Sequence, residues 1–581
     1  MANTASTKST GSKKAQARNA AGAKTAPRME TTSPPADVSE RVWWIGVAVI
    51  LVIAAVLRMY DLNLVPLHHD EGVNGNFLVQ LVREGRYQYD PSNYHGPTLY
   101  YFAAFFPWVV RVLFGKAAME NYGLTTIAIR MVPVLFGLGT IGLIFLLRRW
   151  LGTVATLSAA LLLAVSPGAV YLSRYFIHET HFVFFTLAIV VSCLYFYEYR
   201  NAFYLIPAGA AAALLFATKE TAMISVAVLI IAWAVTLVYL RLHRGKVVPA
   251  RVKGRRQPEP RSLSRFADEL GGPFALGLCV VLAVVTFASL YVIFYSSFFT
   301  NAKGLSDSLQ TFAVWSKTGT EAHVHSLYTY IRWLVNREGP LLFLAALGAL
   351  FIVLKPKNSF ALFSALWAFG LLAAYSLIPY KTPWLMLNFV VPLALIAGYI
   401  VQTIYELAAR QWRLRRVVSF WVLSVVTGVV LLLVLSFTTY QSVDLNFINY
   451  DNDKTSYVYV YAHTTRGLLD LVKEIDRIGN ERSGGQTGIT IVSPDYWPLP
   501  WYLRNYSRVG YYGRLAPSTE PMIIANAIQQ PEVEANFSQF YQQVRSRQPD
   551  GTFELRPGVR LLLYERRKDV VTTEPPSIAR P

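Results

Sequence analysis

The chain has 581 residues, of which 54% are hydrophobic and only 15% are charged, and its mean hydropathy is +0.34. Soluble domains carry about 45–50% apolar and about 25% charged residues, so this composition excludes an ordinary soluble protein and indicates a polytopic membrane protein. The formal net charge of +19 would suggest nucleic acid in a soluble chain. Cytoplasmic loops of membrane proteins collect lysine and arginine, so we expect no nucleic-acid partner.

Residues 1–42 are rich in Ala, Ser, Thr, Lys and Pro, and we expect them to form a disordered basic tail in the cytoplasm. Apolar runs long enough to cross a bilayer follow this tail. They lie at about 43–59, 125–147, 151–171, 181–199, 202–218, 221–240, 273–299, 339–354, 359–378, 384–403 and 417–439. The sequence therefore predicts a polytopic α-helical membrane protein with about eleven transmembrane helices.

One further apolar run, residues 97–114, carries Pro107 and Arg111 and is ambiguous. If it spanned the membrane, the later basic segments would lie outside while the basic tail stayed inside. Because lysine and arginine set the orientation of spans, we predict that 97–114 lies along the outer surface as an amphipathic helix. The N-terminus is then cytoplasmic and the C-terminus is extracytoplasmic.

These predictions divide the chain into a transmembrane domain at 43–440, with an outer first loop at 60–124, and an extracytoplasmic domain at 441–581. Within the second domain, "YVYVYAHTT" (457–465) alternates like a strand and "RGLLDLVKEIDRIG" (466–479) has helical spacing. "GITIVS" (488–493) reads as a short buried strand, and "PMIIA" suggests another. This mixture indicates a small α/β domain.

Titratable residues gather at the predicted outer ends of different spans, where charge is costly and usually faces a cavity. They are His68, His69, Asp70 and Glu71; His95; Arg174, His178, Glu179 and His181; Lys219 with Glu220; and Lys381. Carboxylates beside lysines suit a substrate with a lipid tail, a phosphate and a polar headgroup. A carboxylate can accept a proton from an attacking hydroxyl, and lysines can stabilise a departing phosphate. Aromatic side chains that could hold a sugar ring are Tyr94, Tyr100, Tyr101, Trp384 and Trp497.

Each cluster also has a simpler explanation. Asp70 could cap the helix suggested by "GVNGNFLVQLVREG", and Glu179 could pair with Arg174. Lys219 and Lys381 could be interfacial lysines that extend toward water. A pair of histidines, His178 and His181, could form half of a metal site.

The chain resembles the GT-C superfamily of membrane glycosyltransferases, in particular the protein mannosyltransferase and aminoarabinose transferase branch. More narrowly, it is similar to the family of flippase-activity-associated proteins. The resemblance rests on "PLHHDEGVN", "YDPSNYHGPTLYY", "SRYFIHETHFVFF", "ATKETA", "YKTPWLMLNFVVPLALIAGY" and "YWPLPWYLRNY", which cover residues 43–510 in order.

The resemblance implies roles for the matching residues. GT-C enzymes carry an acidic residue in the first outer loop, which makes Asp70 the candidate catalytic base with Glu71 beside it. Glu179 matches a second acidic position in the second outer loop. Lys219 matches a lysine that contacts lipid phosphate in the aminoarabinose branch, and Lys381 matches a basic residue before a late span.

The chain departs from that branch where a Glu-Lys-Pro-Pro-like motif is replaced by Tyr94-His95-Gly96-Pro97. His95 is nevertheless kept as a candidate polar contact to substrate, together with Arg174 and His69. A divalent metal is left open, with His178 and His181 as its candidate ligands.

The implied reaction moves a sugar from a polyprenyl-phosphate donor to an acceptor hydroxyl on the extracytoplasmic face, with inversion at the anomeric carbon. The implied partners are the lipid-linked donor, the bilayer and a glycan or protein acceptor, and the implied location is the plasma membrane. The alternative is an accessory or component of a lipid-linked sugar flippase.

Overall fold

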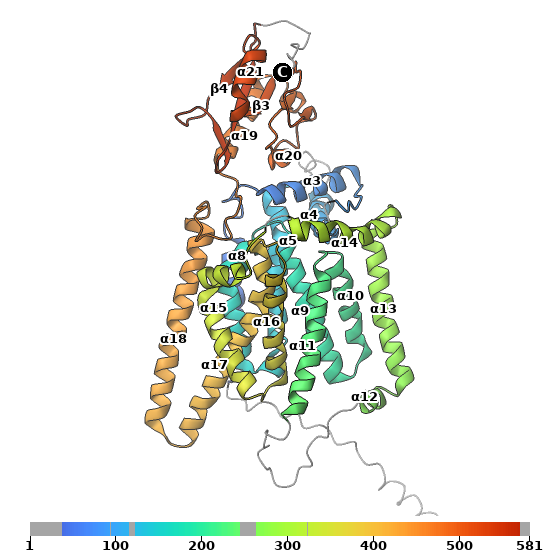
Figure 1. Ribbon diagram of the computed structural model, residues 1–581, viewed down its shortest axis with the longest axis vertical. Coiled ribbons are helices and arrows are strands. Elements are labelled where there is room, and N and C mark those ends of the chain that lie inside the picture. Colours follow the sequence, from blue (N-terminus) through green and yellow to red (C-terminus); the bar gives the residue numbers. More distant parts are fainter. Residues whose placement is uncertain (1–37, 93–94, 115–122, 244–262, 322–323, 570–581) are drawn as a thin grey trace, which may run out of the picture.

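The computed structural model describes residues 38–92, 95–114, 123–243, 263–321 and 324–569. The tail predicted to be disordered, the basic segment around 250 and Tyr94 lie largely or wholly outside these ranges. The described chain forms a helical bundle with a smaller sheet domain stacked on one end (Figure 1).

The bundle contains the apolar helices that the sequence predicts. They are α2 (Glu40–Met59), α5 (Thr126–Phe145), α7 (Thr153–Val165), α8 (Pro167–Ser173), α9 (Glu179–Tyr199), α10 (Leu205–Phe216), α11 (Ala222–Leu242), α13 (Pro273–Tyr295), α15 (Thr329–Leu354), α16 (Ser359–Leu377), α17 (Leu387–Arg413) and α18 (Val417–Val443).

Within the described residues, nine helices are long and apolar enough to cross a membrane. A tenth span arises if α7 and α8, which meet at a 63° bend, are counted as one. The remaining predicted span, 202–218, corresponds to a short 3₁₀ turn (Ala202–Tyr204) followed by α10, which has only 12 residues. It is therefore shorter than the length that a full crossing needs.

Helix α17 occupies the centre of the bundle. Its "LNFVVPLALIAGYIV" segment is apolar on every side and buried throughout, against α7, α15 and α16. A helix that is apolar all round is stable only when it is surrounded. Helices α13 and α18 are also apolar all round but are almost entirely unburied, which fits faces turned toward lipid.

Three helices lie at the end of the bundle nearest the sheet domain: α3 (His69–Glu84), α4 (Thr98–Phe114) and α14 (Lys303–Glu321) (Figure 1). Helix α4 is the predicted surface helix, and it lies beneath α3 instead of running the length of the bundle. At the opposite end, Arg148 forms a 2.7 Å ion pair with Glu40 at the start of α2. The first described helix therefore starts at the end away from the C-terminal domain, as the topology predicts.

The C-terminal domain is built on one six-stranded sheet. Its strands are β1 (Ile489–Ile491), β2 (Val509–Tyr511), β3 (Met522–Asn526), β4 (Tyr541–Val544), β5 (Phe553–Arg556) and β6 (Val559–Arg566). The order is β2-β1-β3-β6-β4, with β5 pairing with β6, and the β2-β1-β3 part is parallel. The helices are α19 (Gly467–Glu481), α20 (Leu499–Tyr502) and α21 (Gln530–Phe537).

The α/β prediction for this domain is confirmed. The predicted helix is α19, whose Leu468, Leu471 and Ile475 are buried at helical spacing against the sheet, and two predicted strands are β1 and β3. The strand predicted at 457–465 is wrong. Its tyrosines pack one by one on the membrane domain instead, and Tyr459 is buried beside Gly168.

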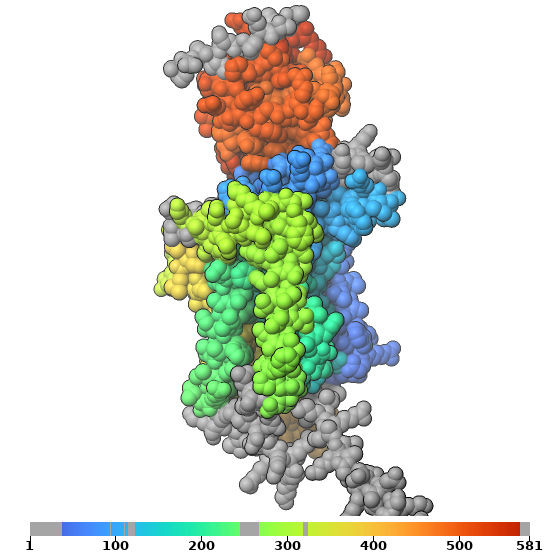
Figure 2. All heavy atoms as spheres, turned by 90° about the vertical axis from the view of Figure 1, so that its right-hand side faces the viewer, coloured from blue at the N-terminus to red at the C-terminus, as the bar shows by residue number. Residues whose placement is uncertain are grey.

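The C-terminal domain rests directly on α3 (Figure 2). Gly72 lets the chain at Pro498 approach the first turn of α3, since a Cβ there would overlap Pro498. The Tyr502 hydroxyl accepts a hydrogen bond from the Leu67 amide at 2.9 Å, and Arg466 donates to the Leu64 carbonyl at 2.8 Å. The C-terminal domain therefore holds the segment before α3 at two points, Leu64 and Leu67.

Candidate active site

The loop before α3 ends in a cap made by His68, not Asp70. The His68 ring accepts a hydrogen bond from the Asp70 amide at 3.1 Å, and the Glu71 carboxylate accepts one from the His68 amide at 3.0 Å. This reciprocal arrangement is a capping box with histidine in place of serine or threonine. The simpler explanation that Asp70 caps the helix is therefore wrong.

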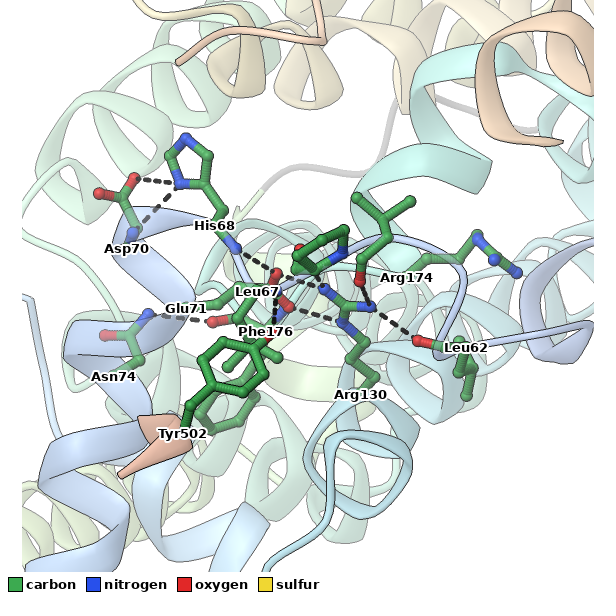
Figure 3. Close-up of polar contacts among 12 residues, drawn as sticks. Leu62, Leu67, His68, Asp70, Glu71, Asn74, Arg130, Arg174, Phe176 and Tyr502 are labelled. Carbon is green, nitrogen blue, oxygen red and sulfur yellow. Dashed lines mark hydrogen bonds and ion pairs between the residues drawn. The ribbon is translucent and has the colours of Figure 1, made fainter. Parts of the chain in front are cut away.

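Glu71 is enclosed in an ion pair with Arg130 of α5 (Figure 3). Its side chain has no exposed surface, and its two oxygens accept from Arg130 Nη2 at 2.6 Å and Nε at 2.8 Å. The Phe176 amide donates to the same carboxylate at 2.8 Å. A carboxylate held this way is poorly placed to accept a substrate proton. The geometry therefore gives Glu71 a structural role and leaves Asp70 as the candidate base.

Asp70 points to the other side of the helix start (Figure 3). Its side chain is 46% exposed, and its Oδ2 lies 3.7 Å from His68 Nδ1. That nitrogen already accepts the Asp70 amide, so the ring proton sits on Nε2, which donates to the Tyr461 carbonyl at 2.9 Å. Asp70 is thus an accessible carboxylate beside the His68 ring.

Two other predicted residues form a second buried ion pair. Lys219, in the turn between α10 and α11, donates to Glu179 at the start of α9 at 2.6 Å, and both side chains are less than 10% exposed. Burial disfavours the charge on Lys219, but Glu179 and Glu220 outweigh it and raise the pKa of the ammonium above its ordinary value. Lys219 is therefore not a lysine that extends to water, and Glu179 pairs with it and not with Arg174.

His95 joins this cluster through Glu220. The His95 ring lies 3.1 Å from the Glu220 carboxylate, which is 1% exposed. Its loop is fastened to the Lys219 turn, because the Gly96 amide donates to the Thr218 carbonyl at 3.0 Å. A Cβ at Gly96 would overlap the Ala217 carbonyl, so this close approach needs glycine.

A pocket of about 390 Å³ lies beside the cluster. Charged and aromatic side chains share its lining: His95, Lys219, Glu220, Thr221, Trp315, Tyr375, Ile378, Tyr380 and Leu385. Lysine, carboxylates and aromatic rings around one cavity provide convergent polar groups on an apolar wall, as small-molecule sites do.

The segment 380–385 links this pocket to Asp70. Tyr380 and Leu385 line the pocket, and the Trp384 ring lies 5.5 Å from the His68 ring beside Asp70. Lys381 lies between them, 1% exposed, with Nζ donating to the Ile378 carbonyl at 2.5 Å. Burial lowers the pKa of Lys381, so this lysine too is not an exposed interfacial one.

The remaining predicted residues lie elsewhere. Arg174 donates to the carbonyls of Tyr60 (2.5 Å) and Asp61 (2.9 Å) at the end of α2, where it satisfies helix carbonyls. It lines a separate pocket of about 280 Å³. His69 lies in the interface with the C-terminal domain, 6.2 Å from the Trp497 ring.

The histidine pair does not share a common partner. The His178 ring donates to the Gly96 carbonyl at 3.2 Å, and the His181 ring is packed against Phe136 at 4.1 Å. Across the part of the chain that the structure describes, no group of three or more His, Cys, Asp or Glu residues is arranged to hold a metal ion. This finding does not test the divalent metal that the sequence leaves open.

Sequence reasoning gave no role to Arg130 or Glu220, and it passed over Tyr380. Arg130 lies inside an apolar run, and an arginine buried there indicates an acidic partner. Glu220 stands next to Lys219, and two opposite charges in a turn between spans already mark a buried cluster.

Residues 48–255 match the model of the dolichyl-phosphate-mannose-protein mannosyltransferase family. This match covers just over a third of the chain and contains Asp70, Glu179 and Lys219. A comparison with curated proteins gives no significant match.

Two solved structures have a similar fold. ArnT from Cupriavidus metallidurans, bound to undecaprenyl phosphate, is 14% identical, with a TM-score of 0.58 over 90% of this chain and 98% of that chain. The oligosaccharyltransferase from Archaeoglobus fulgidus, in its apo form, is 14% identical, with a TM-score of 0.51 over 93% of this chain and 77% of that chain. The chain therefore has the GT-C fold that the resemblance predicts.

These matches do not test the narrower resemblance to flippase-activity-associated proteins, which stays a prediction. None of the matched proteins described above is named as a flippase, so the alternative function gains no support.

Proposed function

We propose that this chain with a GT-C fold is a membrane glycosyltransferase that moves a sugar from a polyprenyl-phosphate donor to an acceptor hydroxyl. The reaction takes place at the end of the bundle that carries the C-terminal domain. We place this end on the extracytoplasmic face of the plasma membrane, and the basic residues near the other end, such as Arg148 and Lys355, support that orientation.

The observation that carries the proposal is the position of Asp70. It is a half-exposed carboxylate in the first turn of α3, and the segment 380–385 connects it to a pocket lined by a buried lysine. Its neighbour Glu71 is enclosed by Arg130, so only one acid of the pair is accessible to an incoming hydroxyl.

In this reaction Asp70 accepts the proton of the acceptor hydroxyl. The oxygen then attacks the anomeric carbon on the face opposite the phosphate, and the bond between that carbon and the phosphate oxygen breaks. Attack from the opposite face inverts the anomeric configuration, through a transition state with oxocarbenium character. The products are the glycosylated acceptor and polyprenyl phosphate.

The phosphate of the donor lies at the Lys219 pocket. An ammonium has three N–H donors, and the hydrogen bond to Glu179 engages one of them. The raised pKa of Lys219 keeps its ammonium group charged, and this charge stabilises the leaving phosphate. Lys381 is a second cation on the segment between the pocket and Asp70, and His95 is a further residue of the pocket lining.

The names of the similar proteins support this donor class. The ArnT structure contains undecaprenyl phosphate, and the matching family is named for a dolichyl-phosphate-linked sugar.

The test is transfer of label from radiolabelled polyprenyl-phosphate hexoses to acceptors in membranes that contain the protein, against matched membranes without it. We expect a labelled product whose anomeric configuration is inverted relative to the donor. Movement of intact labelled donor across proteoliposomes, with no transfer of its sugar, would contradict the proposal and favour a flippase.

A further inference from the structure

One edge of the C-terminal sheet gathers side chains that the proposed chemistry leaves unused. Strands β1, β2 and β3 are parallel, so their carboxyl ends meet at one edge. Asp495 and Trp497 follow β1, Tyr511 ends β2 and Asn526 ends β3. In open α/β sheets, ligands bind in the crevice outside this edge.

A charged pair stands at the centre of this edge. Arg556 forms an ion pair with Asp495, whose other oxygen lies 3.5 Å from Asn526 Nδ2. The ladder between β5 and β6 is irregular between Glu554 and Arg556, and such a bulge redirects the side chain that follows it. Asp495 and Arg556 stay 37% and 20% exposed, so both still present polar atoms to solvent.

Aromatic rings continue the edge on one side of the charged pair. The Tyr496 ring lies 5.6 Å from the Trp497 ring and 5.1 Å from the Tyr511 ring, and all three are partly exposed. Flat rings and hydrogen-bonding groups therefore lie side by side on an accessible surface.

This edge faces the start of α3. The Trp497 ring lies 6.2 Å from the His69 ring, and Gly72 leaves room for Trp497 and Pro498 on the first turn. Burial lowers the pKa of His69, and the charges of Asp70, Arg556 and Asp495 all act on it. His69 therefore contacts this edge and directly precedes the proposed catalytic base, Asp70, in the sequence.

We infer that this sheet edge is the acceptor subsite and that the acceptor is a glycan, with one pyranose ring held against Trp497 and Tyr496. The inference rests on the proposed function, and it goes further by assigning the acceptor class. A pyranose has one apolar face, which suits an aromatic ring, and a rim of hydroxyls, which suits a carboxylate and a guanidinium. Asp495 accepts from the hydroxyls and Arg556 donates to them.

The direct test is saturation-transfer NMR on the full-length protein in nanodiscs, with glucose-, mannose- and galactose-based disaccharides and trisaccharides as probes. We expect saturation to reach the ring protons of at least one probe. Trp497→Ala and Asp495→Asn abolish the transfer, while Trp497→Phe keeps most of it because an aromatic face remains.

A matched control comes from the opposite edge of the same sheet. Arg508, just before β2, forms a 2.7 Å ion pair with Glu520, just before β3, and Arg508→Gln removes a comparable surface pair. This variant keeps the saturation transfer. The inference is overturned if no oligosaccharide binds, if Arg508→Gln loses binding as Asp495→Asn does, or if only a serine- and threonine-containing peptide binds.

A second readout separates this inference from the proposed function. In the labelled-donor assay, Asp495→Asn and Trp497→Ala raise the acceptor KM roughly tenfold or more, while Arg508→Gln leaves the acceptor KM at its wild-type value. If oligosaccharides bind at this edge but no sugar leaves the donor, the proposed function fails and the glycan site stands. If transfer to a glycan proceeds unchanged in both variants, the glycan site fails and the proposed function stands.

Discussion

Two of the buried ion pairs, Arg130 with Glu71 and Lys219 with Glu179, differ in what surrounds them. Arg130 uses all five of its N–H groups, to Glu71 and to the carbonyls of Leu62, Val65 and Pro66. Lys219 has one hydrogen bond to Glu179 among the described contacts and lines a pocket. The first pair closes a loop onto α5, whereas the second leaves N–H groups for a ligand.

The difference follows from the chemistry of the two cations. A guanidinium is planar and can bind a carboxylate through two hydrogen bonds while it satisfies several carbonyls, so it suits a permanent fastening. An ammonium is a compact charge with rotatable donors, so it can keep one carboxylate and still turn toward a phosphate. We therefore assign Arg130 to the fold and Lys219 to the substrate.

The largest effect on stability is expected from Arg130→Met. It leaves the Glu71 carboxylate buried without its cation, which costs about 3–5 kcal/mol. Thermal unfolding in detergent measures the loss. The double variant Glu71→Leu with Arg130→Met recovers much of it, because no charge is left unpaired. Unchanged stability in the single variant would show that this pair does not hold the loop.

Lys219 gives the largest effect on activity among the pocket residues. In a Glu179→Gln background, Lys219→Met leaves no buried carboxylate unpaired at that contact, so the fold is retained. We expect transfer to fall by about 10²-fold or more, because the leaving phosphate loses its cation. Kinetics with the polyprenyl-phosphate donor measure this. If the double variant transfers sugar at the same rate as Glu179→Gln alone, the pair has a structural role only and Lys219 does not act on the substrate.

A smaller effect on activity is expected from Gly96→Ala. The new methyl group pushes the His95 loop away from the Ala217 carbonyl and reshapes one wall of the pocket. We expect a higher donor KM with a smaller change in kcat. Gly428→Ala in α18 is the matched control, since a Cβ there meets nothing within 4 Å. Equal kinetics for the two variants would show that the loop does not shape the donor site.

The smallest expected effect is on how the stability of the fold depends on pH. Burial, chiefly, lowers the pKa of His178 well below its ordinary 6.5, so the folded protein keeps it neutral. The unfolded chain binds the proton more readily, so stability is complete above about pH 6.5 and declines below it by at most about 1.4 kcal/mol per pH unit. Thermal unfolding of His178→Gln should show a weaker decline on acidification. A decline identical to the wild type would contradict this role.

Much of the bundle could be predicted from sequence, because long apolar runs can do little except span or be buried. The surface helix at 97–114 followed from charge bias alone. The strand predicted at 457–465 is wrong although its alternation is real, because alternate tyrosines here meet different partners. Tyr457 stacks under Arg337 at 3.9 Å, whereas Tyr461 packs on Trp384 at 5.7 Å.

The site was predicted only in part. Asp70 and Glu71 are neighbours in sequence, but successive helix residues point about 100° apart, so one meets Arg130 and the other meets solvent. Their different roles depend on a cation 59 residues away. Arg174 and Glu179 are close in sequence yet serve different helix ends, because the chain turns between α8 and α9.

The measurement that tests the central claim most directly is single-turnover transfer by Asp70→Asn, with labelled polyprenyl-phosphate hexose bound before the acceptor is added. The change is nearly isosteric and removes the base from an accessible position, so thermal unfolding should match the wild type. We expect the transfer rate to fall by roughly 10²–10⁴-fold while donor binding is retained. Transfer at the wild-type rate by the folded variant would contradict the assignment of Asp70 as the catalytic base.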